Sequence, residues 1–205
     1  MLYEVFPSPI YYHQATADET ARIKESCISH KDIKSRCDNV KHPDYAIPRT
    51  TDQFNCDDCI TEAGMDYIDQ YVEHHVRKFE ELLGDSNSLV PTTRAKAWFN
   101  WCGKGQGQHW HSHSEARISG TIYITCPDGA IEFRTPNPFT RAGMSPQHGQ
   151  FDTLIQRNPS PGDVILFPGW MEHRVIENTS EYPRISISFD YYTDLGKRIH
   201  VGEKK

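Results

Sequence analysis

The 205-residue sequence predicts an α+β fold in which N-terminal helices back an antiparallel β-sandwich or barrel. Helical periodicity dominates the first part of the chain, whereas short segments rich in β-branched and aromatic residues, separated by Gly, Pro and Asn, make up the second part. The length fits one domain, which we expect to span residues 1–205, with a mainly helical part over 1–90 and a β core over 91–195.

Two helices are expected before the period changes. Residues 17–29, ADETARIKESCIS, carry acidic side chains in the first turn, which favours a helix start. Residues 57–83 place apolar side chains at helical spacing, and Gly84 can end this second helix. So long an amphipathic helix needs a surface to cover. His74 and His75 lie on it, and we expect a solvated face there rather than metal ligands.

Six strands are expected in the second part, because each segment is short, rich in β-branched and aromatic residues, and bounded by turn residues. They are residues 95–102, 117–126, 130–134, 163–168, 173–178 and 184–192. The intervening stretch 135–160 is rich in Pro, Gly and polar residues. Connections of this length in a compact domain are usually functional, so we expect this loop to help select the substrate.

Composition excludes several classes of protein. The net charge is −6, and no run of Lys or Arg occurs apart from the short tail at Lys204 and Lys205, so generic nucleic-acid binding is not expected. No apolar run is long enough to cross a bilayer and the first residues do not resemble a signal peptide, so we expect a cytoplasmic protein without a membrane partner. A homodimer is compatible with the sequence.

The cysteines are expected to remain thiols in that compartment. The six are Cys27, Cys37, Cys56, Cys59, Cys102 and Cys126. Cys56 and Cys59 have the spacing of half a zinc site, but no second pair of this kind follows. We therefore interpret these two as ordinary thiols at the start of a helix.

The segment QHWHSHSE concentrates metal-ligating side chains. On an extended strand alternate residues share a face, so His109, His111, His113 and Glu115 would point the same way. These are more ligands than one site needs, and the main registers are His111 with His113 or His113 with Glu115. His173, from a distant strand, can supply a third ligand. Two close ligands and one remote ligand make a facial triad with open coordination positions.

An anion site is predicted in the segment RISISF. Alternation sets Arg184, Ser186 and Ser188 on one face of this strand and the isoleucines on the other. If the isoleucines pack against the helices, the guanidinium points into the barrel, where a buried charge needs an anionic partner. The carboxylate of a bound ligand fits, held by Arg184 in a fork and by the Ser186 hydroxyl. Arg184 follows His173 by only eleven residues, so this anion site and the metal lie within one small-molecule length.

Together these segments resemble the Fe(II)- and 2-oxoglutarate-dependent oxygenases of the double-stranded β-helix fold (jelly-roll, cupin-like), and in particular a small bacterial and phage branch of them. The resemblance spans nearly the whole chain. It is carried by FPSPIY at 6–11, WFN at 98–100, HSH at 111–113, SGTIY at 119–123, the run at 161–173, and RISISF at 184–189.

The resemblance implies an Fe(II) enzyme that uses 2-oxoglutarate and O2. The co-substrate would chelate the metal through its keto and C1 carboxylate oxygens, while Arg184 and Ser186 bind its far carboxylate. Oxidative decarboxylation to succinate and CO2 would be coupled to oxidation of a substrate C–H bond, with hydroxylation as the default outcome. The protein would orient the reactants and exclude water.

The same resemblance bears on the ligand register. The family's HxH stands at the same distance before its SG as His111 and His113 stand before Ser119, which favours the set His111, His113 and His173. Most of the superfamily has HxD or HxE instead, so Glu115 stays the alternative ligand. Three neutral imidazoles leave the metal one negative charge short of the usual triad.

Further residues are assigned less specific roles. Asn100 and Tyr123 would face the cavity and hydrogen-bond the 2-oxoglutarate, or else be satisfied polar groups of the core. Trp110 and Trp170 would either face the substrate or pack. The substrate could be a small molecule or a protein side chain. Two other classes stay open: a three-His cupin-type enzyme (thiol dioxygenase or isomerase), which would not need Arg184 there, and a metal-stabilised binding module.

Overall fold

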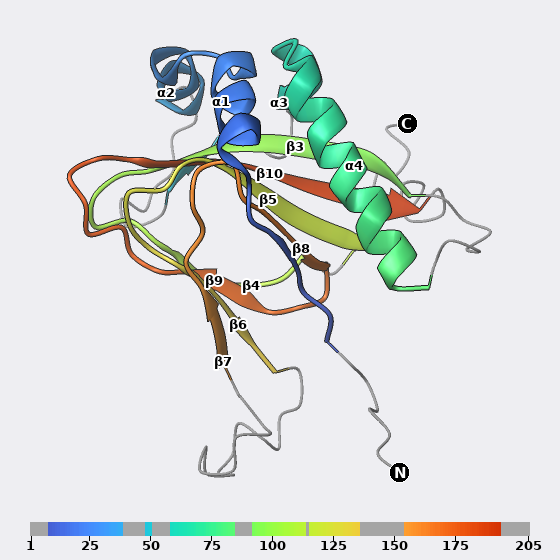
Figure 1. Cartoon of the computed structure of the whole chain (residues 1–205). Coiled ribbons are helices and arrows are strands. Elements are labelled where there is room, and N and C mark those ends of the chain that lie inside the picture. The colour runs from blue at the N-terminus through green and yellow to red at the C-terminus, as the bar shows by residue number, and fades with distance from the viewer. Residues whose placement is uncertain are drawn as a thin grey trace, which may run out of the picture.

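Two antiparallel sheets with helices on the outer side of one of them form the structure, a computed structural model. It describes residues 8–38, 48–50, 58–84, 92–113, 115–135 and 154–193. The helices lie over the larger sheet, and the smaller sheet lies on its opposite side (Figure 1). This arrangement confirms the predicted α+β jelly roll with helices backing the β core.

The described residues form ten strands and four helices. The strands are β1 (Tyr11–His13), β2 (Arg49–Thr50), β3 (Thr92–Cys102), β4 (Gln108–His111), β5 (Ile118–Thr125), β6 (Ile131–Arg134), β7 (Leu154–Arg157), β8 (Val164–Pro168), β9 (His173–Val175) and β10 (Arg184–Thr193). The helices are α1 (Ala17–Ser26), α2 (His30–Asp38), α3 (Cys59–Glu62) and α4 (Asp66–Leu82). The larger sheet has the order β1-β8-β5-β10-β3-β2, and the smaller one β4-β9-β6-β7. Every pairing is antiparallel.

Helix α1 begins with a reciprocal capping box. The Thr16 hydroxyl accepts the backbone N–H of Glu19 at 3.2 Å, and Glu19 Oε2 accepts the backbone N–H of Thr16 at 2.7 Å. The helix ends at Ser26, because Cys27 is extended. The prediction of one helix over 17–29 is thus three residues too long, and α2, which follows directly, was not predicted.

The predicted helix over 57–83 is wrong as a single element. Two helices occupy it, α3 and α4, and between them Gly64 adopts a φ of 65°. A left-handed residue ends a helix, and glycine adopts it without steric cost. The Asp58 side chain caps α3 by accepting the backbone N–H groups of Ile60 and Thr61. Position 57 lies outside the described residues.

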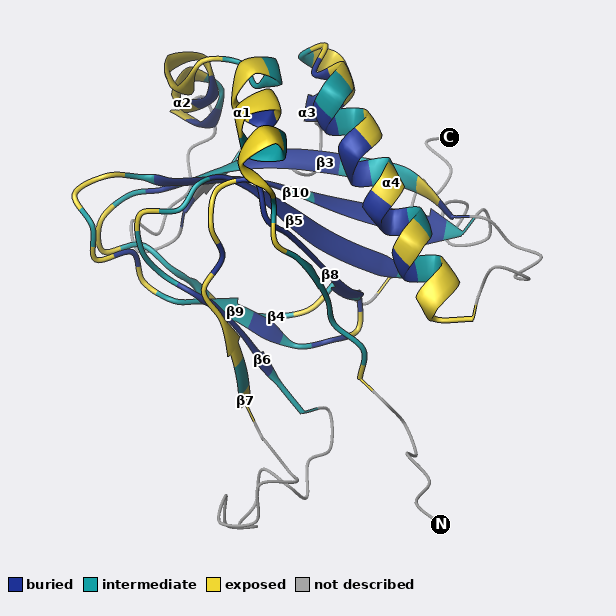
Figure 2. Ribbon diagram, viewed as in Figure 1, coloured by how far each residue is buried: buried dark blue, intermediate teal, exposed yellow. Residues whose placement is uncertain are grey.

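Helix α4 covers the larger sheet with one apolar stripe, while its outer side is exposed (Figure 2). His74 lies on the exposed side, as expected, but His75 is buried, with 2% of its surface exposed. The prediction of a solvated His75 is therefore wrong. His75 follows Val72 by three positions and precedes Phe79 by four, which places it within the stripe.

Strand β10 is flanked on both sides, by β3 and β5. Ile185, Ile187 and Phe189 belong to the core beneath the helices, while Arg184 and the serines at alternate positions line the opposite side. This is the predicted alternation. A smaller apolar cluster fills the space between the sheets: Tyr123, Ile131, Phe133, Ile165, Phe167 and Met171.

All six predicted strands are present with shifted ends, and β1, β2, β4 and β7 add to them. Strand β7 lies within the predicted loop 135–160, which is therefore not irregular throughout; residues 136–153 lie outside the described part. The five cysteines in the described ranges are thiols, and Cys56 falls outside them. None of the described helices is both long and apolar enough to span a membrane.

Candidate active site

Three imidazoles converge between the two sheets. His111 ends β4 and His173 begins β9, and the antiparallel pairing of these strands sets the two residues opposite each other. His113 lies two positions beyond β4, where its backbone N–H donates to the carbonyl of Gly169 at 2.8 Å. One ring nitrogen from each of the three histidines lies within 4.8 Å of the other two. The residues assigned to the metal from the sequence are thus brought together.

The rings of His111 and His173 are oriented by backbone carbonyls. The Nδ1 atom of His111 lies 2.7 Å from the carbonyl oxygen of His109, and that of His173 lies 3.0 Å from the carbonyl of Met171. A carbonyl only accepts, so Nδ1 carries the proton and Nε2 keeps its lone pair. Burial lowers the pKa of His111 and holds the pKa of His173 well below its usual value. Both rings are therefore neutral at neutral pH, as metal ligands must be.

His113 is oriented by a carboxylate instead. Its Nδ1 lies 3.1 Å from Oδ2 of Asp190, and Oδ1 of this buried aspartate accepts a hydrogen bond from the Ser119 hydroxyl at 2.6 Å. Asp190 was not among the site residues predicted from the sequence. The signal was there, because Asp190 continues the every-second-residue pattern that begins at Arg184 on the cavity side of β10.

Glu115 and His109 are not brought to this cluster. Strand β4 ends at His111, and the Ala116 backbone N–H then donates to the carbonyl of His113 in a turn that leaves Glu115 exposed. The β4–β9 register shifts before His111, and His109 is exposed. The expectation that four alternate side chains share one face is wrong, because the β4–β9 register shifts between Gln108 and His111 and the strand ends at His111.

A cavity of about 160 Å³ lies at the three imidazoles. All residues assigned from the sequence to 2-oxoglutarate line it as well: Arg184, Ser186, Asn100 and Tyr123. The Asn100 amide donates to the hydroxyl oxygens of Ser186 at 3.3 Å and Ser188 at 3.0 Å. Burial raises the pKa of the Tyr123 phenol, which therefore stays protonated and able to donate.

The Arg184 guanidinium is buried, with 3% of the residue exposed. It donates to the carbonyls of Asp128 at 3.1 Å and Ile176 at 2.9 Å and to the Cys102 sulfur at 3.2 Å. No carboxylate in the described ranges forms an ion pair with it. Two of its five N–H groups make none of these hydrogen bonds, and Arg184 lines the cavity.

Gly129 leaves room for this guanidinium. A Cβ at position 129 would lie 1.6 Å from the Arg184 Nη1 atom, and the backbone there has a φ of +95°. Only glycine meets both conditions. Gly129 was not predicted from the sequence either, since a glycine between strands usually indicates a turn.

The two tryptophans do not line the cavity. The Trp110 ring packs against the guanidinium groups of Arg134, at 4.7 Å from the ring centroid, and Arg174, at 5.1 Å. Trp170 is 45% exposed. Packing, the other role considered for Trp110, agrees with its contacts.

Residues 96–190 match a protein family described as "Putative 2OG-Fe(II) oxygenase". The matched range contains the three histidines and the residues around Arg184. The sequence matches no curated protein.

Solved structures share the fold at low sequence identity. A prolyl hydroxylase from Trichoplax adhaerens, in complex with a peptide fragment of the hypoxia inducible factor oxygen degradation domain, has a TM-score of 0.61 and 12% identity, over 93% of this chain and 86% of that one. The non-heme alpha ketoglutarate dependent epimerase SnoN from nogalamycin biosynthesis has a TM-score of 0.58 and 13% identity, over 90% of this chain and 76% of that one. EctD from S. alaskensis with bound Fe has a TM-score of 0.53 and 16% identity, over 90% of this chain and 73% of that one. The chain has the double-stranded β-helix fold of these proteins.

Proposed function

We propose that the chain is a 2-oxoglutarate–Fe(II) oxygenase, which couples the oxidative decarboxylation of 2-oxoglutarate to succinate and CO2 with the hydroxylation of a substrate C–H bond; the family match over residues 96–190 and the shared fold support this. One observation carries the proposal. A single cavity of about 160 Å³ is lined by three converging imidazoles and by a buried guanidinium that has no acidic partner in the described ranges. A metal-chelating anion such as 2-oxoglutarate satisfies both groups at once.

His111, His113 and His173 are the proposed Fe(II) ligands. Imidazole suits Fe(II), and three ligands leave positions for a chelating co-substrate and for O2. Bound Fe(II) supplies the activation of O2. Asp190 hydrogen-bonds to His113, so its carboxylate supplies part of the negative charge that three neutral ligands lack. The alternative ligand Glu115 is exposed.

Arg184 and Ser186 are proposed to hold the far carboxylate of 2-oxoglutarate. Backbone carbonyls and the Cys102 sulfur fix the Arg184 guanidinium, so it meets a carboxylate without reorganising. The Ser186 oxygen already accepts from Asn100, which leaves the serine proton to donate to the ligand. The protonated Tyr123 hydroxyl is a further donor on the cavity wall.

The substrate is proposed to be a small molecule or a protein side chain. The prolyl hydroxylase of the same fold was solved with a peptide, and SnoN belongs to nogalamycin biosynthesis, so the fold accommodates both kinds. Fe(II), 2-oxoglutarate and O2 are the implied requirements in either case.

Spectroscopy and product analysis test the proposal together. Anaerobic addition of Fe(II) and 2-oxoglutarate should give a weak visible charge-transfer band, and admission of O2 should release succinate, slowly without substrate and faster with a substrate from a panel. A chain that shows neither band nor succinate is not such an oxygenase. O2 uptake with a thiol and without 2-oxoglutarate would favour a three-His thiol dioxygenase.

Arg184 variants sharpen this test. Arg184→Ala should raise the KM for 2-oxoglutarate by roughly 10- to 100-fold, because it removes charge-assisted hydrogen bonds, while Fe(II) still binds. Arg184→Lys keeps the charge without the fork and should lie between wild type and Arg184→Ala. Equal loss of metal and co-substrate binding would contradict the anion-site role.

A further inference from the structure

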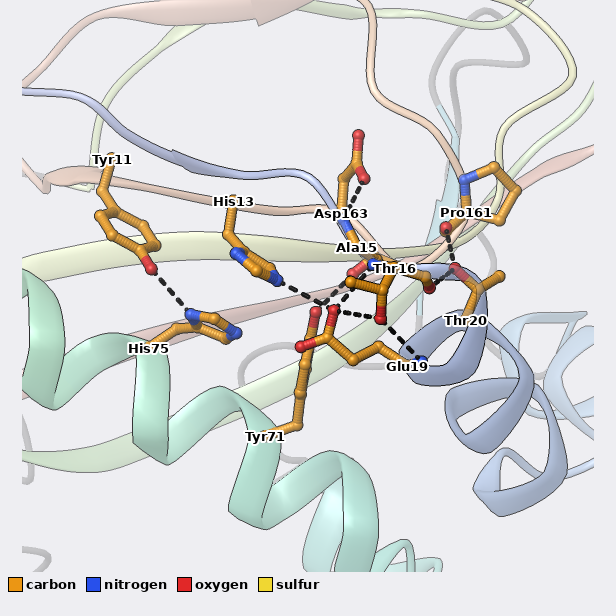
Figure 3. A network of polar contacts seen from close by, with 11 residues as sticks. Tyr11, His13, Ala15, Thr16, Glu19, Thr20, Tyr71, His75, Pro161 and Asp163 are labelled. Atoms are coloured by element: carbon orange, nitrogen blue, oxygen red, sulfur yellow. Dashed lines mark hydrogen bonds and ion pairs between the residues drawn. The ribbon is translucent and has the colours of Figure 1, made fainter.

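A second group of metal-ligating side chains lies under the helices, away from the cavity. His13 ends β1, Glu19 lies in the first turn of α1, and His75 lies in the middle of α4. One ligand atom from each lies within 4.8 Å of the other two. Figure 3 shows the three side chains pointing toward one another from these three elements. None of them lines the cavity that holds the three imidazoles.

We propose that His13, Glu19 and His75 form a second metal site, which binds a divalent ion of the Zn²⁺ class and clamps the N-terminal strand to the helices. The site is independent of the proposed Fe(II) centre, because the two share neither residues nor cavity.

The strongest indication is the state of the His75 ring. Its Nδ1 hydrogen-bonds with the Tyr11 hydroxyl at 2.8 Å, whereas Nε2 is the one buried side-chain nitrogen or oxygen in the described ranges that makes no hydrogen bond. A buried polar atom without a partner destabilises the folded chain. In the tautomer whose Nδ1–H donates to the Tyr11 oxygen, Nε2 carries the lone pair that a metal ion needs. A metal ion in contact with Nε2 removes the penalty.

The other two ligands are already placed for coordination. His13 Nε2 and Glu19 Oε2 lie 3.3 Å apart, as a hydrogen bond or ion pair in the metal-free chain. This is also about the separation of two ligands on a tetrahedral Zn²⁺ with bonds of ~2.0–2.1 Å, so an ion could replace the shared proton without moving either side chain far. The rings of His13 and His75 are 4.1 Å apart between centroids, so modest rotations bring the third nitrogen into reach. The side chains of His13 and Glu19 are 23% and 26% exposed, which gives the ion a path from solvent and leaves room for a water ligand.

The carboxylate of Glu19 is held by its own helix. Oε2 accepts the backbone N–H of Thr16 at 2.7 Å and the Thr16 hydroxyl at 2.9 Å. Such support fixes the orientation of a metal ligand in advance. A purely structural capping box accounts for Glu19, but it leaves the unpartnered nitrogen of His75 and the close approach of the two tilted histidine rings unexplained.

The donor set selects the ion. Two neutral imidazoles and one carboxylate are a common ligand set for Zn²⁺, and such a site binds Zn²⁺ more tightly than Fe(II). The consequence is structural. Strand β1 has three residues and forms one edge of the larger sheet, and a metal would cross-link it to α1 and α4.

Zinc loading tests the proposal in a chain whose cavity cannot bind metal. In a His111→Ala/His173→Ala background, chelator-treated and desalted protein should take up one Zn²⁺ per chain, measured by mass spectrometry of the metal. Zn²⁺ at a hundred times its Kd should raise the Tm by roughly 5–10 °C. Addition of His13→Gln or of Glu19→Gln should abolish both uptake and stabilisation.

The exposed neighbour His74 supplies the matched control. His74→Gln in the same background should keep the bound Zn²⁺ and the rise in Tm. Glu19→Gln retains the capping box, and Tm values in chelator should show that the variants fold. The proposal is overturned if the background chain binds no Zn²⁺, or if Zn²⁺ persists after either His13→Gln or Glu19→Gln. The outcome is independent of the proposed oxygenase activity, because neither readout involves 2-oxoglutarate.

Discussion

Asp190 lies directly behind His113: its Oδ2 atom is 3.1 Å from the histidine Nδ1, and its Oδ1 atom accepts a hydrogen bond of 2.6 Å from the Ser119 hydroxyl. The three residues come from β10, from the turn after β4, and from β5. A carboxylate in this position fixes the tautomer and orientation of an imidazole and raises its basicity toward a metal. Asp190 thus places a carboxylate directly behind one of the three converging imidazoles.

Replacement of Asp190 by asparagine should weaken metal binding. The Asp190→Asn variant keeps the size of the side chain but removes its charge, and the Fe(II) affinity should fall by roughly 10- to 100-fold. An anaerobic Fe(II) titration with saturating 2-oxoglutarate, followed by the visible band, measures this. Ser119→Ala should have a smaller effect. An unchanged affinity in Asp190→Asn would mean that His113 needs no carboxylate.

The ligand register gives a paired prediction. His111→Ala should abolish the visible band, because it removes a converging imidazole, whereas Glu115→Ala should keep it, because that side chain is exposed. Both proteins can be compared in one anaerobic experiment. Loss of the band in Glu115→Ala and its survival in His111→Ala would establish the other register.

Gly129→Ala should impair 2-oxoglutarate binding through Arg184. The added methyl would lie 1.6 Å from Nη1, so the guanidinium must move, and the KM for 2-oxoglutarate should rise at least about 10-fold. Gly105→Ala is the matched control, because φ is +78° there and its added carbon would meet only the Glu177 carboxylate at 4.0 Å. Gly105→Ala should lose about 1–2 kcal/mol of stability in urea unfolding from backbone strain, and Gly129→Ala should lose at least as much. A KM that rises equally in both would point to backbone strain alone.

Alkaline pH should remove the stabilisation that comes from the hydrogen bond between Tyr12 and Asp163. The Tyr12 hydroxyl donates to Oδ2 of Asp163 at 2.6 Å, and burial together with this bond raises the pKa of Tyr12 from 10.0 to about 12. The folded chain therefore holds this proton more tightly than the unfolded one. The resulting stability is fully present below pH 10 and is lost as the pH rises toward 12.

Urea unfolding at pH 8 and pH 11 measures that loss. The stability lost between the two pH values should be smaller in Tyr12→Phe than in wild type. Tyr182→Phe, at a side chain that is 74% exposed, should behave like wild type. Equal losses in wild type and Tyr12→Phe would show that this hydroxyl does not contribute to the pH dependence.

The fold could be predicted from the sequence where apolar residues recur at a regular spacing and so show which side of an element packs against the core. Strand β10 alternates so regularly that its two faces could be assigned from the sequence alone. The break at Gly64 and the burial of His75 were not predictable in the same way. A single glycine is compatible with a helix interior, and a histidine on a helix becomes buried only when the sheet packs against that side. Strands β1 and β7 are too short to show a period. The extent of the single domain over residues 1–205 stays a prediction.

The candidate site was predictable as a set of residues but not as a set of contacts. The spacing of His111, His113 and His173 suggested a cluster, and the structure brings them together. Where strand β4 would end could not be predicted, since SHSE alternates as well as HWHS does. The partners Asp190 and Gly129 come from other strands and turns, and such pairings depend on the sheet register, which the sequence does not display.

The position of β10 limits how this protein can be re-engineered. Substitutions on one face of this strand would disturb the core under the helices, and substitutions on the other would disturb the proposed co-substrate site. Freedom to change the substrate therefore lies at the margins of the cavity, where Pro48 and Thr50 at β2, Gln108 of β4 and Val175 of β9 line it from edge or short strands. A library confined to these four positions would vary the substrate pocket while leaving the β10 residues unchanged.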